Sequence, residues 1–279
     1  MRRLRLLPIL IAIVLAALAQ NAAPPSFRFV ILGDRTGEVQ PGVWEAVWKQ
    51  AAAEKPDFIV GVGDTIQGND DATADAEWRQ AQQIMAPYRG IPLFLAPGNH
   101  DVWSPASEKL FPKYTGHPLH YSFDHGPAHF TILDNSRADA LSAEEFAFLE
   151  ADLEEHKAQP LKFVVSHRPS WLVEAALHNT LGEFHRLAHK YGVQYVVAGH
   201  VHELLHIEVD GVSYFCAPSA GGHLRDSMKY EAGWFFGYTV VTVHGADVSL
   251  QIKELGPPYG EGHVTGLSDW ELDGLKVRR

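Results

Sequence analysis

Short apolar runs and amphipathic stretches alternate along the first third of the chain. Residues 27–32, 58–62 and 91–95 are apolar runs of strand length, and each leads into a polar turn that contains glycine. Residues 41–55 and a stretch ending near residue 85 show the apolar spacing of helices. This order predicts a sheet built from βαβ units, whose functional loops gather at the carboxyl ends of the strands.

The pattern changes in the rest of the chain, where hairpins join further strand–helix units. Ser142, followed three residues later by Glu145, is the capping-box signature of a helix start, and a further helix is predicted over residues 180–191. The mixture predicts an α/β protein with two mixed sheets packed face to face. We expect one domain over residues 27–255, with a Gly- and Pro-rich tail, 256–279, packed on it. The remaining predicted strands are 119–123, 129–133, 161–165, 194–197, 204–209, 212–215, 234–243 and 248–252.

The N-terminus has the pattern of a secretory signal. Residues 1–5 are basic, residues 6–18 are almost entirely apolar, and small residues stand at Ala17 and Ala19. We expect a signal peptide over 1–19 and a linker over 20–26, with an uncleaved membrane anchor as the alternative. A cleaved chain would be periplasmic or secreted, without stable membrane association.

Composition narrows the classes of partner. Cys216 is the single cysteine, so no disulfide within the chain can form and stability must come from a packed core. The formal net charge is −11, and without the three Arg of the signal it becomes −14 (−11 minus 3). Such a charge argues against nucleic acid as a general partner, and an anionic substrate would need a local positive centre.

Polar side chains of a particular kind follow five of the predicted strands. Each one alone could be a turn residue or a buried histidine with a satisfied hydrogen bond, but turn preference does not explain five. Two carboxylates, an amide oxygen and imidazoles are too many ligands for one four-coordinate ion. They suit two ions about 3.5–4 Å apart that share a carboxylate and a water. The residues are Asp34, Asp64, Asn99 with His100, His167, and His200 with His202.

His200 and His202 are two residues apart. In an extended segment their side chains would point the same way, which would let them serve neighbouring ions.

These motifs, in this order, resemble those of the calcineurin-like metallophosphoesterases over residues 27–202. They are Gly33-Asp34, Gly63-Asp64, Gly98-Asn99-His100-Asp101, Ser166-His167 and Gly199-His200-Val201-His202. The resemblance implies a four-layer α/β/β/α sandwich of two mixed sheets. It also implies a binuclear centre of Mn, Fe or Zn ions that hydrolyses small-molecule phosphate esters.

The resemblance further implies a role for each residue. Asp64 would bridge the ions, Asp34 and His202 would bind the first, and Asn99, His167 and His200 the second. His100 would be a catalytic histidine outside the ligand set, steered by Asp101.

The chain departs from the family pattern at one position. The first motif of the family usually reads Asp-x-His, whereas here Thr36 follows Asp34 and Arg35. Some relatives compensate with a Tyr after the second motif, where this chain has Gln67. We expect a weaker or different first metal, completed by water or by Gln67. Arg35 and Arg168, which stand beside ligand positions, are candidates to bind the substrate phosphate.

Three functions therefore stay open from the sequence. The first is an exported metal-dependent hydrolase of phosphate esters. The second is a degenerate binding protein of the same fold, suggested by Thr36. The third is a dinuclear hydrolase that acts on another type of bond.

Overall fold

The computed structural model describes residues 26–173, 182–225 and 227–270. The predicted signal peptide lies outside these residues, as does the predicted linker except for Ser26. In the described part of the chain, every helix is too short or too polar to cross a membrane.

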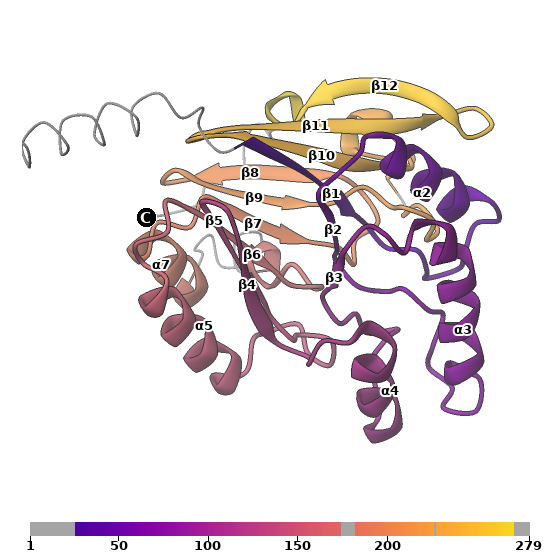
Figure 1. The fold of residues 1–279 in the computed structure, drawn as a ribbon, viewed down its shortest axis with the longest axis horizontal. Helices are drawn as coiled ribbons and strands as arrows, with labels where there is room; N and C mark the ends of the chain where they lie inside the picture. The colour runs from indigo at the N-terminus through magenta and orange to yellow at the C-terminus, as the bar shows by residue number, and fades with distance from the viewer. Residues whose placement is uncertain (1–25, 174–181, 226, 271–279) are drawn as a thin grey trace, which may run out of the picture.

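The first sheet has six strands in the order β12-β11-β10-β1-β2-β3 (Figure 1). Strand β1 pairs in parallel with β2, which pairs in parallel with β3, whereas β10, β11 and β12 continue the sheet in antiparallel fashion. The bounds are β1 (Ser26–Leu32), β2 (Phe58–Gly61), β3 (Leu93–Leu95), β10 (Gly237–His244), β11 (Asp247–Gly256) and β12 (Gly260–Gly266). The helical elements before, between or after its strands are α2 (Val43–Ala53), α3 (Ala74–Met85), η1 (Ala86–Tyr88), η3 (Tyr230–Ala232) and η4 (Leu267–Trp270).

The second sheet also has six strands, in the order β4-β5-β6-β7-β9-β8. Strands β5, β6, β7 and β9 run parallel, and β4 and β8 are its antiparallel edges. The strands are β4 (Tyr121–His125), β5 (Ala128–Ile132), β6 (Leu161–Val165), β7 (Tyr195–Ala198), β8 (Leu205–Val209) and β9 (Val212–Cys216). The helices are α4 (Pro105–Thr115), which precedes this sheet, α5 (Ala143–Glu155), α6 (Ser170–Val173) and α7 (Gly182–Lys190).

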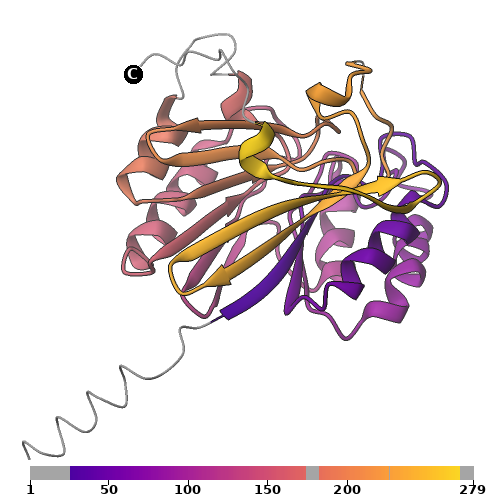
Figure 2. The ribbon, with the colours of Figure 1, turned by 90° about the horizontal axis from the view of Figure 1, so that it is seen from above.

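The core divides into layers because side chains alternate along each strand. Phe29 and Ile31 of β1 face the second sheet, while Val30 and Leu32 pack beneath α2. Between the sheets, the ring of Phe29 lies edge-on to that of Phe130 at 5.2 Å. Leu149 of α5 and Leu187 of α7 cover the outer face of the second sheet. Figure 2 shows the two sheets inside and the helices outside, which confirms the four-layer sandwich.

Two local predictions differ from the structure, and one helix was not predicted. The predicted tail contains β12, which pairs with β11 as an edge strand of the first sheet. The stretch that forms α4 had no predicted element, and there the Ser104 hydroxyl accepts from the backbone N–H of Ser107. At α5 only half of the capping box is present, because the Glu145 carboxylate accepts from the N–H of Asp134 instead.

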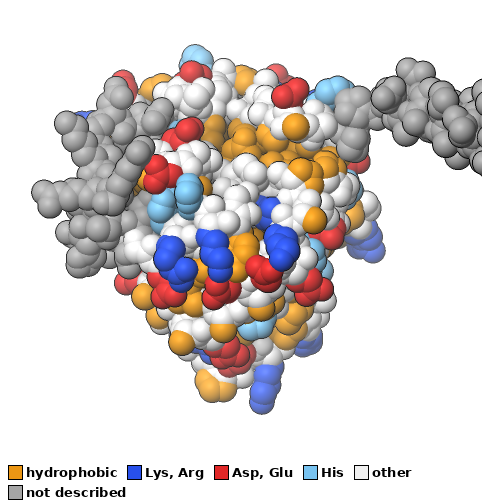
Figure 3. Space-filling view, turned by 90° about the vertical axis from the view of Figure 1, so that its left-hand side faces the viewer, with side chains coloured by type: hydrophobic (Ala, Val, Ile, Leu, Met, Phe, Trp, Pro, Cys, Tyr) orange, Lys and Arg blue, Asp and Glu red, His pale blue; other side chains and the backbone are white. Residues whose placement is uncertain are grey.

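Charges of both signs are mixed on the surface shown in Figure 3. Basic side chains at the centre of this face lie directly beside acidic ones, and hydrophobic side chains form a patch above them. Exposed charges of opposite sign that lie side by side contribute little to stability.

Candidate metal centre

The carboxyl ends of strands from both sheets meet in one place because glycines allow their loops to approach closely. A Cβ on Gly98 would lie 2.2 Å from Oδ1 of Asp64, and one on Gly199 would lie 2.6 Å from Oδ2 of Asp34. Such distances exclude any side chain at these two positions. The glycine in each motif therefore has a steric role, which is to bring the next loop against a carboxylate.

Four donor side chains converge around His167 and form what we call the second cluster. Nε2 of His167 lies 3.0 Å from Oδ1 of Asn99, 3.2 Å from Oδ2 of Asp64 and 3.2 Å from Nδ1 of His200. The other ring nitrogen of His167 contacts the backbone carbonyl of Val62 at 2.9 Å. This carbonyl orients the ring in the way that outer partners orient metal-binding histidines.

Asp64 also belongs to a neighbouring group, the first cluster, with Asp34 and His202. One donor atom from each of the three lies within 4.8 Å of the others, and all three residues are buried. His202 is held by its Nδ1 against the carbonyl of His223 at 2.6 Å, which leaves Nε2 facing Asp34 at 3.7 Å. A Cβ on Gly37 or Gly222 would collide with the His202 ring at 2.5 or 2.6 Å, so both positions form a seat for it.

Three residues of these clusters have left-handed backbone conformations. Asp64, His200 and His202 have φ of 56°, 69° and 57°. Such conformations cost about 1–3 kcal/mol each and are concentrated at functional sites. The segment from His200 to His202 is therefore a turn and not extended as expected, and the turn sends the two imidazoles to different clusters.

The electrostatics of the second cluster favour a protonated His167 beside an ionised Asp64. Burial would raise the pKa of Asp64, but the charge and hydrogen bond of His167 outweigh it and lower the value to about 2. Burial likewise opposes the charged form of His167, yet Asp64 raises its pKa to about 9. The pKa of His200 falls to about 4, because burial and the cationic His167 both disfavour a second proton. The environment of the second cluster therefore favours a positive charge next to Asp64.

His100 and Asp101 have different environments. The backbone N–H of His100 donates to Oδ1 of Asp64 at 2.9 Å, and its Nδ1 faces the carbonyl of Gln67. Asp101 is fully buried and accepts from the backbone N–H groups of Thr65, Ile66 and Gly98 at 2.8–3.2 Å. Asp101 therefore fixes the two loops that carry Asp64 and His100, so its expected influence on His100 acts through the backbone.

At the position where the family pattern has its first histidine, Thr36 is buried and bonded to Gln67. Its hydroxyl donates to Oε1 of Gln67 at 2.5 Å, and the same oxygen accepts from the N–H of Glu38 at 3.2 Å. Thr36 and Gln67, the two positions at which the chain differs from the family pattern, are thus hydrogen-bonded to each other.

The two arginines differ in accessibility. Arg35 is 5% exposed and its Nη1 donates to the carbonyl of Thr65 at 2.9 Å, so its charge supports the loop and is not presented to solvent. This placement does not fit the substrate contact expected of Arg35. Arg168 is partly exposed, pairs with Asp139 at 2.6 Å and lies 3.4 Å from Nε2 of His200. Its position beside the second cluster keeps it a candidate for binding an anion.

Asn135 was missed by the sequence analysis. Its Oδ1 accepts from the N–H groups of His167 and Arg168 at 3.0 and 2.9 Å, so it fixes the loop that carries both. Asn135 follows the buried strand β5, and this is the same signal that identified the other five loops.

Both clusters fit divalent metal ions. Their donors are carboxylate and amide oxygens and imidazole nitrogens, Asp64 is common to both, and outer carbonyls hold the rings of His167 and His202. Asp34, Asp64 and His202 could hold one ion, and Asp64, Asn99, His167 and His200 the other.

A third group of histidine and carboxylate side chains has a different geometry. The rings of His129 and His156 stack at 3.8 Å and 13°, and both nitrogens of His129 contact carboxylates, Asp124 at 2.7 Å and Asp152 at 2.9 Å. Imidazole binds metals in the ring plane, and two stacked, nearly parallel rings do not direct their nitrogens at a common point. Both nitrogens of His129 are in addition engaged in hydrogen bonds to carboxylates. We therefore interpret this group as an ion-pair cluster.

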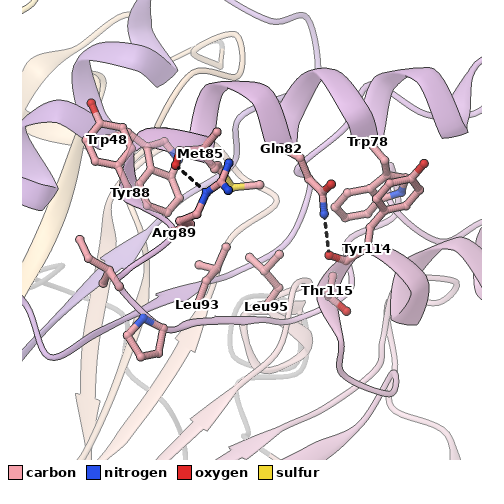
Figure 4. A pocket seen from close by; sticks show the side chains of 13 residues that line it. Trp48, Trp78, Gln82, Met85, Tyr88, Arg89, Leu93, Leu95, Tyr114 and Thr115 are labelled. Atoms are coloured by element: carbon pink, nitrogen blue, oxygen red, sulfur yellow. Dashed lines mark hydrogen bonds between the residues drawn. The ribbon is translucent and has the colours of Figure 1, made fainter.

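The structure also has a pocket of about 520 Å³ between α3 and β3, lined by Trp48, Trp78, Met85, Tyr88 and Leu93 among others. Figure 4 shows Gln82 and Arg89 bonded to backbone carbonyls at its rim. The residues that line it belong to neither metal cluster.

Known proteins are similar to this chain in sequence and in fold. A family model described as calcineurin-like phosphoesterase matches residues 27–204. Purple acid phosphatase 15 of Arabidopsis thaliana is 29% identical over 130 residues, which cover 40% of this chain and 24% of that protein. The match thus spans about a quarter of the length of that relative.

Solved structures share the fold as well, among them two phosphatases. Purple acid phosphatase PPD1 of yellow lupin (Lupinus luteus) superposes with a TM-score of 0.66 at 17% identity, over 87% of this chain and 54% of that chain. A dimetal phosphatase from Danio rerio superposes with a TM-score of 0.56 at 13% identity, over 86% of this chain and 98% of that chain.

Proposed function

Because the chain belongs to the calcineurin-like phosphoesterase family, we propose that it is a metal-dependent hydrolase of small phosphomonoesters or phosphodiesters. The observation that carries this proposal is the convergence of four donor side chains at the second cluster, with Asp64 shared by the first. Such an arrangement is what two ions with a common carboxylate require.

The assignment of ligands follows the two clusters. Asp34, Asp64 and His202 hold one ion, and Asp64, Asn99, His167 and His200 hold the other, with Mn, Fe or Zn as the candidate metals. When bound, the ions supply an activated water and positive charge for the phosphoryl oxygens. That local charge is what the acidic chain otherwise lacks, since its formal net charge is −11.

His100 is the proposed proton donor. Its N–H bond to Asp64 fixes its backbone, and the contact of Nδ1 with the Gln67 carbonyl leaves Nε2 available to the leaving oxygen. Asp101 acts as a positioning residue for this loop.

Arg168 is the proposed contact for the substrate phosphate. Asp139 and the carbonyl of Ser136 hold its guanidinium next to His200. A phosphate oxygen would take over the guanidinium bond now made to the exposed Asp139.

Replacement of the proposed acid tests this function. His100→Ala is expected to lower kcat/KM for a phosphomonoester or phosphodiester chromogen by about 10²–10⁴-fold, the usual contribution of a general acid. The metal content, measured by elemental analysis, should stay unchanged because His100 is outside both clusters. The matched control is His244→Ala at the exposed end of β10, which should retain full activity. Equal activity of the two variants would contradict the role of His100.

A degenerate binding protein is the second candidate, and Thr36 is the observation that favours it. The hydrogen bond from Thr36 to Gln67 leaves the first cluster with one donor fewer than the second. Wild-type protein that binds ions yet fails to hydrolyse either chromogen with Mn, Zn, Fe or Co would establish this alternative. Hydrolysis that depends on His100 would exclude it, together with a hydrolase for another type of bond.

We also propose that the protein is exported. The support is the sequence pattern of residues 1–19. N-terminal sequencing of the protein released by its natural host is expected to begin at Gln20, and an intact Met1 would refute cleavage.

A further inference from the structure

The two clusters share a carboxylate but differ in what else they provide. Among the described residues, the first cluster adds Asp34 and His202 to Asp64, whereas the second adds Asn99, His167 and His200. Both oxygens of Asp34 already accept from the backbone N–H of His200, at 2.9 and 3.1 Å. The single carboxylate that the first cluster does not share is therefore partly engaged before any ion binds.

Thr36 lies beside the histidine of the first cluster, and its hydroxyl is bonded to Gln67. The seat of His202 is formed by Gly37, next to Thr36, and by Gly222, whose Cβ would lie 2.2 Å from the Thr36 carbonyl. The hydroxyl proton of Thr36 is directed to Gln67, and the Gln67 oxygen has both its lone pairs used by Thr36 and Glu38. The hydroxyl of Thr36 and the side-chain oxygen of Gln67 are thus used in hydrogen bonds between their two loops. Neither residue supplies an anionic or nitrogen ligand to a metal ion in the first cluster.

We infer that this chain binds its two ions unequally, with a tightly held ion in the second cluster and a weaker one in the first. This inference rests on the proposed function, and it makes catalytic activity depend on the concentration of free divalent cation. For ions such as Zn²⁺, the second cluster, with four protein donors of which two are imidazoles, should have the higher affinity. The first cluster has three donors and only one imidazole. The first cluster, with mostly oxygen donors and more places for water, suits a harder ion such as Mn²⁺.

Metal retention tests the inference without any measurement of activity. The purified full chain is stripped with a chelator, equilibrated with Zn²⁺ and Mn²⁺ in equal amounts, passed through a desalting column and analysed for both elements. We expect about one Zn²⁺ per chain to remain, and Mn²⁺ to be retained only when it is present in the column buffer. Two ions retained to the same extent would overturn the inference.

Thr36→His restores the donor that the family pattern has at this position. It is expected to strengthen binding at the first cluster by at least about tenfold, the low end of what even outer partners contribute, so that two ions survive desalting. The matched control is Thr36→Val, which removes the bond to Gln67 without adding a ligand and should retain one ion. Equal retention by a folded Thr36→His and by Thr36→Val would contradict the inference.

Gln67→Glu keeps the test decisive where a histidine cannot be accommodated beside Gly37. Gln67 is exposed, and a carboxylate there can still accept from Thr36 and Glu38 while adding a negative charge beside the first cluster. We expect tighter Mn²⁺ binding, seen as a lower midpoint in a titration followed by electron paramagnetic resonance. An unchanged midpoint would argue against the inference.

The outcomes also separate this inference from the proposed function. Unequal retention without hydrolysis of either chromogen would refute the function and leave the inference standing. Hydrolysis with two equally retained ions would support the function and refute the inference.

Discussion

The first and second clusters are built by the same local device and differ in their donors. In both, a strand ends at a glycine that lets a neighbouring loop touch a carboxylate, and a backbone carbonyl holds one histidine by its Nδ1. In the second cluster, donor atoms of Asn99, Asp64 and His200 lie 3.0–3.2 Å from Nε2 of His167. In the first cluster, the Thr36 hydroxyl is bonded to Gln67. Among the described residues, the donors of that cluster are then the side chains of Asp34, Asp64 and His202.

This difference shows that the scaffold of a metal site and its ligand set are separable. Gly37 and Gly222 still form the seat of His202, and its ring is still oriented by His223, although the neighbouring ligand is missing. The backbone arrangement depends on close packing of the loops and on the hydrogen bonds that buried backbone N–H groups donate to the Asp101 carboxylate. A ligand can therefore be replaced by a hydrogen-bonded pair without loss of the fold.

Removing one histidine from each cluster is the strongest way to test the difference between them. In excess Mn²⁺, His167→Ala is expected to lower kcat/KM on the order of 10²–10³-fold, comparable to losing one preorganised electrostatic contact. His202→Ala is expected to lower it by about 10–100-fold, because its cluster already binds weakly. After desalting, His202→Ala should retain its single ion and His167→Ala should retain none.

Circular dichroism and thermal melting would show that both variants are folded, which matters because His167 and His202 are buried. The comparison would be wrong if His202→Ala lost the retained ion and His167→Ala kept it.

Much of this centre was predictable because burial constrains the strands on both faces. The strands that flank the sheet interface are continuous apolar runs, and the polar residue that ends each run stands out against them. Asp34, Asp64, Asn99 and His167 were found in this way. Asn135 carries the same signal after β5, but an asparagine without a neighbouring histidine in sequence is ordinary turn chemistry.

Other features depend on contacts that no local pattern contains. Strand β12 has the sequence Gly-Glu-Gly-His-Val-Thr-Gly, which is poor in strand formers, and it becomes a strand by pairing with β11. Helix α4 contains Pro112, which argues against a helix in the sequence, but its Ser104–Ser107 capping box stabilises the start. The destination of the Thr36 hydroxyl, 31 residues away at Gln67, follows only from the fold.

The ion-pair cluster around His129 extends the comparison to a histidine that the structure uses for stability. Burial opposes the charged form of His129, but its hydrogen bonds to Asp152 and Asp124 outweigh this and raise its pKa above 6.5. Burial alone would raise the pKa of Asp152. Hydrogen bonds from His129, Thr131 and Ser122 outweigh this and lower the pKa below 3.8. The contribution of His129 is therefore complete below pH 6.5 and is lost as the pH rises through its raised pKa. That of Asp152 is present above pH 3.8 and is lost as the pH falls through its lowered pKa.

Asp152→Asn is accordingly expected to lower the free energy of unfolding by about 2–3 kcal/mol at pH 6, because it leaves a buried imidazolium with half its partners. The loss should be smaller at pH 9, where His129 is closer to neutral. Urea unfolding of chelator-treated protein measures this without a contribution from bound ions. The matched control is Asp124→Asn, which removes the partner on the other nitrogen of the same ring. Because the Asp124 side chain is 45% exposed, its removal should cost under about 1 kcal/mol. A destabilisation by Asp152→Asn that is the same at both pH values would show that the cluster acts through packing and not through the charge of His129.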